Sequence, residues 1–166
     1  MAKASFTLLI LAAALLSVAF SKIQVIREGE YTLEWEVDNE NITVTAVAKT
    51  LGYVGFGISP FGTMMDADIV LSGRYSNGTG YIQDSWAFAN SGPERDDVQN
   101  VQLISATENA THTTVTFTRK LVADDLEQDK SIVNATQSII WSYGPTDSFQ
   151  YHGPNRGVVS INLVEA

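Results

Sequence analysis

Residues 52–86 read GYVGFGISPFGTMMDADIVLSGRYSNGTGYIQDSW, and this stretch decides the fold. Its large residues Val54, Phe56 and Ile58 recur at every second position, which places them on one face of a β-strand. The glycines between them leave the opposite face almost bare, a pattern that suits close approach by another backbone or by a flat ligand. Turn residues separate this strand from two further runs, at 69–71 and 81–86. The stretch therefore predicts three consecutive strands joined by turns.

The rest of the chain continues this pattern of short alternating runs between turn residues. No segment of useful length has the 3.6-residue period of an amphipathic helix, although residues 124–130 allow one helical turn in a charged, exposed stretch. Short strands without crossover helices predict an all-β fold, an antiparallel β-sandwich of roughly ten strands. The other predicted strands cover residues 31–37, 42–47, 101–106, 113–118, 138–143 and 157–163.

The first 21 residues have the pattern of a secretory signal peptide. Lys3 is followed by an apolar run over Phe6–Phe20, and Ala19 and Ser21 are the small residues expected before a cleavage site. A membrane anchor is the alternative, but the run is short for a span, which needs roughly twenty apolar residues. We expect a secreted, extracellular protein with a single domain over residues 22–166 and no membrane span after cleavage.

Composition narrows the possible partners and the means of stabilisation. The chain has no cysteine and a formal charge of −9 at pH 7. An acidic protein is a poor candidate for binding nucleic acid, and a secreted domain without disulfides depends on its core, a ligand or a metal. Four Asn-X-Thr acceptors at predicted turns or strand ends indicate N-glycosylation; they are Asn41, Asn77, Asn109 and Asn134.

Aspartates form one candidate site. Asp66 and Asp68 are two residues apart and project alike on an extended chain. Asp84 and the pair Asp96 and Asp97 follow in neighbouring segments that can converge on them. Carboxylates without histidine or thiolate favour a hard cation such as Ca²⁺. The alternative is that Asp68 caps a turn or pairs with Arg74 or Arg156.

His152 and a methionine of the central stretch form a second candidate site. His152 lies between aromatic and glycine residues just before the last predicted strand, whereas His112 lies in a polar turn. An imidazole and a thioether together hold a six-coordinate, electron-transfer haem. The chain has no Cys-X-X-Cys-His, so covalent haem attachment is excluded. The alternative is that the methionines fill the core and the histidine bonds to backbone.

The segments GFGISPFGTMMDADIV, YIQDSW and YHGPNRG resemble the DOMON domain. That domain is the N-terminal module of the dopamine β-monooxygenase family and of its monooxygenase-like relatives. The chain also resembles, more distantly, the haem-carrying cytochrome domains of cellobiose dehydrogenase and of some plant secreted proteins. The resemblance runs from about Tyr31 to Leu163 and implies a β-sandwich fold.

The resemblance also implies two sets of site residues. In the haem-carrying relatives the motif Gly-X-Met-X-X-Ala/Ser supplies one axial ligand, which falls on Met64, with His152 as the other ligand of haem b. The monooxygenase-like relatives, which share the Tyr-His-X-X-X-Arg-Gly pattern, are not established haem proteins.

In dopamine β-monooxygenase the DOMON module has a proposed metal site. Carried over by resemblance, that site falls on the carboxylate of Asp68, the carbonyls of Ile69 and Ser85, and Asn100. The family has an aspartate where this chain has Asn100, so the calcium-like site would carry one negative charge less here.

The sequence favours a binding module over an enzyme. Two histidines in total cannot make the two copper sites of the monooxygenases, and no nucleophile elbow, phosphate loop or zinc signature occurs. We expect a non-catalytic ligand-binding or interaction module, with a haem-b electron-transfer domain or glycan binding as alternatives. Its partner would be a small molecule, a glycan, or a redox or other protein. Candidate sugar-stacking rings are Tyr53, Trp86, Trp141, Tyr143, Phe149 and Tyr151.

Overall fold

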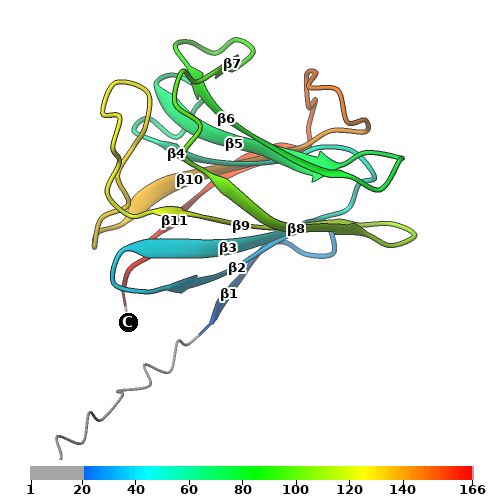
Figure 1. Ribbon diagram of the computed structural model, residues 1–166, viewed down its shortest axis with the longest axis horizontal. Helices are drawn as coiled ribbons and strands as arrows, with labels where there is room; N and C mark the ends of the chain where they lie inside the picture. Colours follow the sequence, from blue (N-terminus) through cyan, green and yellow to red (C-terminus); the bar gives the residue numbers. More distant parts are fainter. Residues whose placement is uncertain (1–20, 166) are drawn as a thin grey trace, which may run out of the picture.

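The computed structural model describes residues 21–165, which form eleven strands in two antiparallel sheets, with no helix among these residues (Figure 1). This confirms the predicted antiparallel β-sandwich. The predicted signal peptide, residues 1–21, lies outside the described residues except for its last position. The predicted helical turn at residues 124–130 is a single turn, in which the N–H of Asp129 donates to the carbonyl of Asp125 over 3.0 Å.

The first sheet has five strands, and its order differs from their order in the chain. The strand β3 pairs with β9 along its whole length, so the sheet joins the N-terminal strands to a later hairpin. The five strands, in spatial order, are β1 (Lys22–Arg27), β2 (Tyr31–Val37), β3 (Asn41–Ala48), β9 (Thr113–Lys120) and β8 (Gln102–Glu108).

The second sheet has six strands and contains the central stretch of the sequence. The strand β4 lies in its middle and pairs with β10 on one side and β5 on the other. The six strands, in spatial order, are β11 (Arg156–Ile161), β10 (Gln137–Tyr143), β4 (Val54–Ser59), β5 (Ala67–Arg74), β6 (Gly80–Ala87) and β7 (Glu94–Arg95).

The main core lies between the sheets and follows from the alternation of the strands. In β2, the side chains of Tyr31, Leu33 and Trp35 are buried while the residues between them are more exposed. They meet Phe56 of β4 and Phe117 of β9 in one hydrophobic cluster. Each strand thus gives one apolar face to the core, as expected for a sandwich.

The glycine-rich face of β4 is covered by the neighbouring strands. A Cβ at Gly57 would lie 2.8 Å from the carbonyl oxygen of Asp68 and 2.9 Å from Ile140 Cγ1. A Cβ at Gly55 would lie 2.5 Å from the hydroxyl of Ser142. The space beside these glycines is therefore filled by atoms of the adjoining strands β5 and β10, which corresponds to the first of the two expected alternatives, close approach by another backbone.

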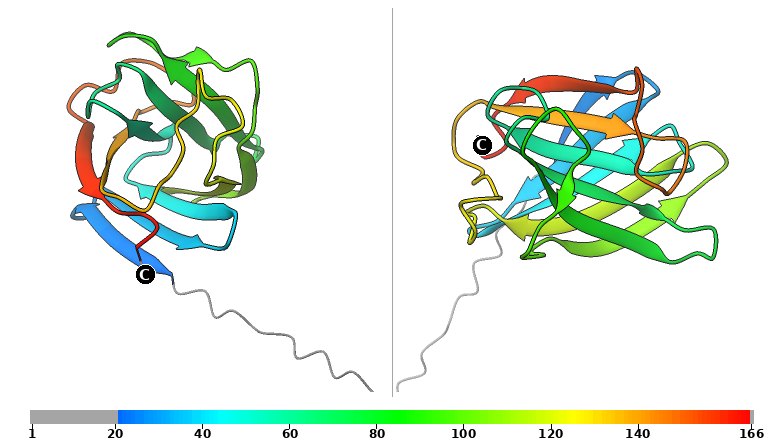
Figure 2. Two further views of the ribbon diagram at one scale, coloured as in Figure 1. Left: turned by 90° about the vertical axis from the view of Figure 1, so that its left-hand side faces the viewer. Right: turned by 90° about the horizontal axis from the view of Figure 1, so that it is seen from above.

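The long loops lie at opposite ends of the sandwich. The β9–β10 loop, yellow in Figure 1, lies at the end where β4 stops and β5 begins, and the β10–β11 loop, orange, lies at the other end. Viewed from the first end, the yellow loop crosses in front of the strands (Figure 2, left). This loop places Asp129 near the beginning of β5, beside Asp68.

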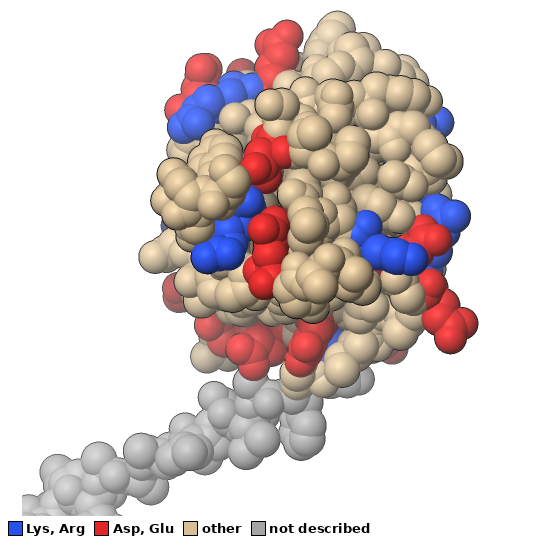
Figure 3. Space-filling model, turned by 90° about the vertical axis from the view of Figure 1, so that its right-hand side faces the viewer, with Lys and Arg blue, Asp and Glu red and all other residues tan. Residues whose placement is uncertain are grey.

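Two further features concern the charge on the surface and the possibility of a membrane-spanning helix. Acidic and basic groups are dispersed over the end of the molecule seen in Figure 3, without forming one basic patch there. Within the described residues, no helix has the length and apolarity needed to cross a bilayer.

Candidate metal centre

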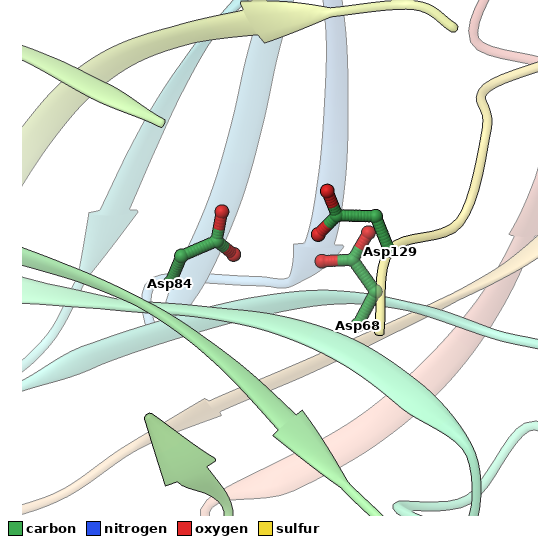
Figure 4. A group of neighbouring side chains, drawn as sticks. All are labelled: Asp68, Asp84 and Asp129. Carbon is green, nitrogen blue, oxygen red and sulfur yellow. The ribbon is translucent and has the colours of Figure 1, made fainter. Parts of the chain in front are cut away.

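Three aspartates converge at one end of the sandwich. Asp68 in β5 and Asp84 in β6 both point into the space between the sheets, since they are in phase with Val70 and Ile82 on adjacent paired strands. Asp129 arrives from the β9–β10 loop. Figure 4 shows Asp68 and Asp129 side by side, with the carboxylate of Asp84 turned toward them.

The three carboxylates are close together and almost without contact with solvent. One oxygen from each of Asp68, Asp84 and Asp129 lies within 4.8 Å of the others. These residues are 1%, 0% and 1% exposed. Each has a buried oxygen, Oδ1 in every case, that accepts no hydrogen bond within the described residues. Such groups are rare in folded proteins, and their usual partners are a bound water or an ion.

Arg119 supplies the positive charge nearest to Asp68. Its side chain projects from β9 in phase with Val115 and Phe117, so a guanidinium occupies an otherwise apolar face. Arg119 Nη1 donates to Asp68 Oδ2 over 2.7 Å, and the side chains of the pair are 2% and 0% exposed. The backbone N–H of Lys130 donates to the same oxygen over 2.8 Å. Asp68 Oδ1 remains free to face the other carboxylates.

Two further residues complete the surroundings. The side-chain amide of Asn100 donates to Asp129 Oδ2, and its backbone N–H donates to Asp84 Oδ2 over 3.4 Å. Asp96 is 4% exposed, and neither of its carboxylate oxygens accepts a hydrogen bond within the described chain. Among residues 21–165, four buried carboxylates therefore share one buried guanidinium, that of Arg119.

The pKa values reflect this excess of negative charge. Burial, together with the neighbouring Asp68 carboxylate, raises the pKa of Asp84 to about 7. Burial and the Asp129 carboxylate raise the pKa of Asp96 to about 7. Burial also raises the pKa of Asp129. Burial is the largest single influence on Arg119 and opposes its charge, but Asp68, Asp84 and Asp129 together outweigh it and raise the pKa of the guanidinium. The cluster therefore takes up protons or a cation more readily than separate aspartates do.

The geometry fits a hard cation. Calcium binds oxygen ligands at about 2.3–2.6 Å, so two ligands of one ion lie at most about 5 Å apart. The 4.8 Å limit among the three carboxylate oxygens satisfies this condition. The donor set contains neither histidine nor thiolate, which disfavours transition metals. Asp68, Asp84 and Asp129 are the residues that would hold the ion, and Asn100 donates hydrogen bonds to two of them.

The structure separates some residues that the sequence grouped together. Asp66 adopts a left-handed backbone with φ of 53°, which breaks the extended alternation and turns its carboxylate away from Asp68. Its Oδ1 instead accepts from Lys130 Nζ over 2.9 Å and from the indole N–H of Trp86 over 3.3 Å. Lys130 lowers the pKa of Asp66 through this bond. Asp97 is exposed, unlike Asp96.

The backbone ligands suggested by resemblance lie elsewhere in the sheet. Ile69 and Ser85 pair with each other across β5 and β6, and Ile69 also pairs with Gly57 of β4. Their side chains project to the face opposite Asp68, and β5 is paired on both sides, so its carbonyls are engaged in the ladder. Of the four ligands suggested by resemblance, the structure places Asp68 and Asn100 in the carboxylate cluster. The other members of that cluster are Asp84 and Asp129.

Asp129 was missed by sequence reasoning because it lies in a stretch expected to be exposed. No periodicity distinguishes it from Asp124, which is exposed, or from Asp125, which is half-buried. Arg119 did carry a signal, since the alternation of β9 places it in phase with Val115 and Phe117.

The two proposed haem ligands lie at different ends of the second sheet. Met64 is in the β4–β5 loop, which follows Ser59, whereas His152 is in the β10–β11 loop, which precedes Arg156. Arg156 lies level with Gly55 in the strand register. Four residues of extended strand, about 13 Å, separate these levels. Axial ligands of one iron must face each other across that atom.

Neither side chain is poised for an iron between them. Met64 packs against a second, smaller hydrophobic cluster, separate from the main core. This cluster contains Ile69 and Leu71, which are only 5% and 4% exposed. His152 Nδ1 lies 3.4 Å from Arg156 Nη1, and burial lowers the pKa of this histidine. Two hollows of about 450 and about 10 Å³ are lined by other residues. Met64 and His152, as they lie here, do not fit a haem held by this pair.

We expect protein expressed with excess haem to show no Soret band after purification. The measurement is the visible spectrum, with haem content determined in parallel. His152→Ala and Met64→Ala should leave the spectrum unchanged for the same reason. A low-spin haem spectrum abolished by both substitutions would contradict this expectation and would require the two loops to rearrange.

Comparison with known proteins agrees with the fold and places the chain among its relatives. The chain is 41% identical over 141 residues to human DBH-like monooxygenase protein 1, a match that covers 82% of this chain and 23% of that protein. The chain thus spans about a quarter of that relative's length.

Two solved structures share the fold at low sequence identity. The cytochrome domain of cellobiose dehydrogenase from Myriococcum thermophilum superposes with a TM-score of 0.65 at 13% identity, covering 86% of this chain and 81% of that domain. The cytochrome b domain of pyranose dehydrogenase from Coprinopsis cinerea has a TM-score of 0.59 at 10% identity, with 78% and 75% covered. Residues 27–144 match the family model of the DOMON domain, and the chain belongs to the DOMON domain family.

Proposed function

We propose that this chain is a secreted, non-catalytic DOMON module that binds Ca²⁺ at Asp68, Asp84 and Asp129 and acts as a ligand-binding or interaction module. The observation that carries the proposal is the convergence of three buried carboxylates, each with an oxygen that accepts no hydrogen bond from the part of the chain that the structure describes. Leaving charged groups buried and unpaired is costly, and a bound cation removes that cost.

A non-catalytic role agrees with the residues present. The chain has two histidines, one in a polar turn and one beside Arg156, and neither lies in the carboxylate cluster. The relatives named monooxygenases are about four times as long as the matched region, so their activity need not reside in it. The likeness to cytochrome domains points to a redox protein as one class of partner.

Glycosylation would accompany secretion. Asn77, Asn109 and Asn134 are exposed in connections between strands, and Asn41 begins β3. In the first two, the side-chain oxygen accepts backbone N–H bonds, from Thr79 and from Thr111 and His112 respectively. That arrangement leaves the amide nitrogen, which carries an N-glycan, turned to solvent. Among the rings considered for sugar stacking, Trp141, Tyr143 and Tyr53 are buried and Tyr151 is exposed.

Calcium should raise the melting temperature of the protein. Only the folded chain gathers the three carboxylates, so the ion stabilises the folded state, by about 2.7 kcal/mol at a hundred times its dissociation constant. The measurement is thermal unfolding in chelator and in millimolar Ca²⁺. Asp129→Asn should remove most of the gain, and Asp97→Asn, which changes an exposed neighbour, should retain it.

A second variant tests the direction of the effect. Asn100→Asp adds a carboxylate beside Asp129 and restores the charge expected from the family resemblance. It should strengthen calcium binding and lower stability in chelator, because it adds a like charge to the cluster. Superimposable melting curves of the wild type with chelator and with calcium would reject the proposed site.

A further inference from the structure

The β9–β10 connection is unusually long for a compact sandwich. It runs from Leu121 to Thr136 without a strand and crosses the end of the molecule (Figure 2, left). Connections longer than about 12–15 residues without regular structure are uncommon and are often functional. Val122 and Leu126 are 69% and 75% exposed, so much of the loop contributes little to the core.

The inner part of this loop is fastened to the carboxylate cluster. The N–H of Lys130 donates to Asp68 Oδ2 over 2.8 Å, and Arg119 Nη2 donates to the carbonyl of Lys130 over 3.2 Å. The preceding residue, Asp129, accepts from Asn100. Lys130 Nζ extends to Asp66. Residues 129 and 130 thus join the loop to β5, to β9 and to the β4–β5 loop.

The contact between the loop and the carboxylate cluster also brings like charges together. Asp129 is the only member of the three-carboxylate group that the loop contributes, since Asp68 and Asp84 belong to paired strands. Without a cation, like charges on the loop and on the sheet face each other in a buried space. With a cation, the carboxylate of the loop and those of the sheet bind one ion, and the repulsion becomes a bridge.

We infer that a cation bound at this centre clasps the β9–β10 loop onto β5 and β6, so that attachment of the loop depends on the ion. This inference rests on the proposed cation site and adds that binding of the ion controls the attachment of the loop. Release of the loop would also reshape a groove of about 450 Å³, because the loop forms one wall of it through Leu121, Val122 and Ile132. The facing wall includes Glu40 of the β2–β3 turn and Val164 near the C-terminus.

The test separates binding from clasping in the full chain. Terbium luminescence reports occupancy, since Tb³⁺ replaces Ca²⁺ and Trp86 lies opposite Asp68 in the strand register as an antenna. Hydrogen exchange measured by mass spectrometry then compares chelator with millimolar Ca²⁺. Peptides that contain the amides of Lys130 and Ile132 should exchange at least tenfold more slowly in calcium, while those of the β10–β11 loop, at the other end of the sandwich, should not change.

Matched variants identify the carboxylate responsible. Asp129→Asn should lose the calcium-dependent protection of the loop, whereas Asp124→Asn, which changes an exposed position in the same loop, should keep it. If terbium binds but the loop exchanges at the same rate in chelator and in calcium, the clasp is wrong and the cation site is retained. Absence of terbium and calcium binding would overturn both. The wild-type comparison decides the question even where Asp129→Asn folds poorly.

Discussion

Replacing Arg119 with methionine is expected to lower the free energy of unfolding of the calcium-free protein by about 3–5 kcal/mol, the range for breaking a buried ion pair by removing one partner. Methionine keeps much of the apolar volume of the arginine but leaves Asp68 Oδ2 with only the N–H of Lys130. Asp84 and Asp129 then repel Asp68 without any compensating charge within the described cluster. The measurement is urea denaturation at neutral pH in the presence of chelator.

Calcium should recover part of this loss. An ion bound by the three carboxylates supplies positive charge where the guanidinium was removed, so the gain from calcium should be larger in Arg119→Met than in the wild type. Lys120→Met is the matched control, because Lys120 is the next residue and pairs with Asp124 in an exposed ion pair. Exposed pairs contribute about 0–1 kcal/mol. Equal losses in the two variants would show that the cluster does not depend on Arg119.

The sandwich was predictable because its strands alternate. In β2, Tyr31, Leu33 and Trp35 form the buried face, and in β9 Val115 and Phe117 do so together with Thr113 and Arg119. Turn residues mark the strand ends. The pairing of β3 with β9 was not predictable from periodicity, because alternation gives a strand its two faces and says nothing about its neighbours. The glycines of β4 show the same limit: their spacing indicated close approach but not that β5 and β10 provide it.

The candidate site was predictable only in part. Asp68 and Arg119 are in phase with buried apolar residues of their own strands, and Asp84 is in phase with the half-buried Ile82. Three charged residues in register with apolar ones are a signal that the sequence contains. Asp129 has no such signal, since a loop has no fixed period and its burial depends on where the chain crosses the end of the sandwich. The separation of Met64 from His152 likewise follows from strand register, which a motif match does not contain.

Asp84→Asn should stabilise the calcium-free protein at pH 8 and abolish its dependence on calcium. The pKa of Asp84 is raised in the folded state to about 7, above its ordinary value of 3.8. The folded chain therefore binds more protons than the unfolded chain between these values, and stability falls as the pH rises through that window. Above pH 7 the full penalty is present, on the order of 4 kcal/mol by the free-energy equivalent of this pKa shift. Asparagine at this position carries no charge at any pH.

The decisive comparison is therefore denaturation of wild type and Asp84→Asn at pH 5 and pH 8, each in chelator and in calcium. In chelator, the wild type should be less stable at pH 8 than at pH 5, and the variant should lose less over the same range, with Asp96 still titrating. In calcium at pH 8, the wild type should regain stability while the variant gains little, because a neutral amide replaces a carboxylate ligand. A wild type equally stable at both pH values in chelator would mean that Asp84 titrates normally, and the argument for a cation at this centre would lose its electrostatic basis.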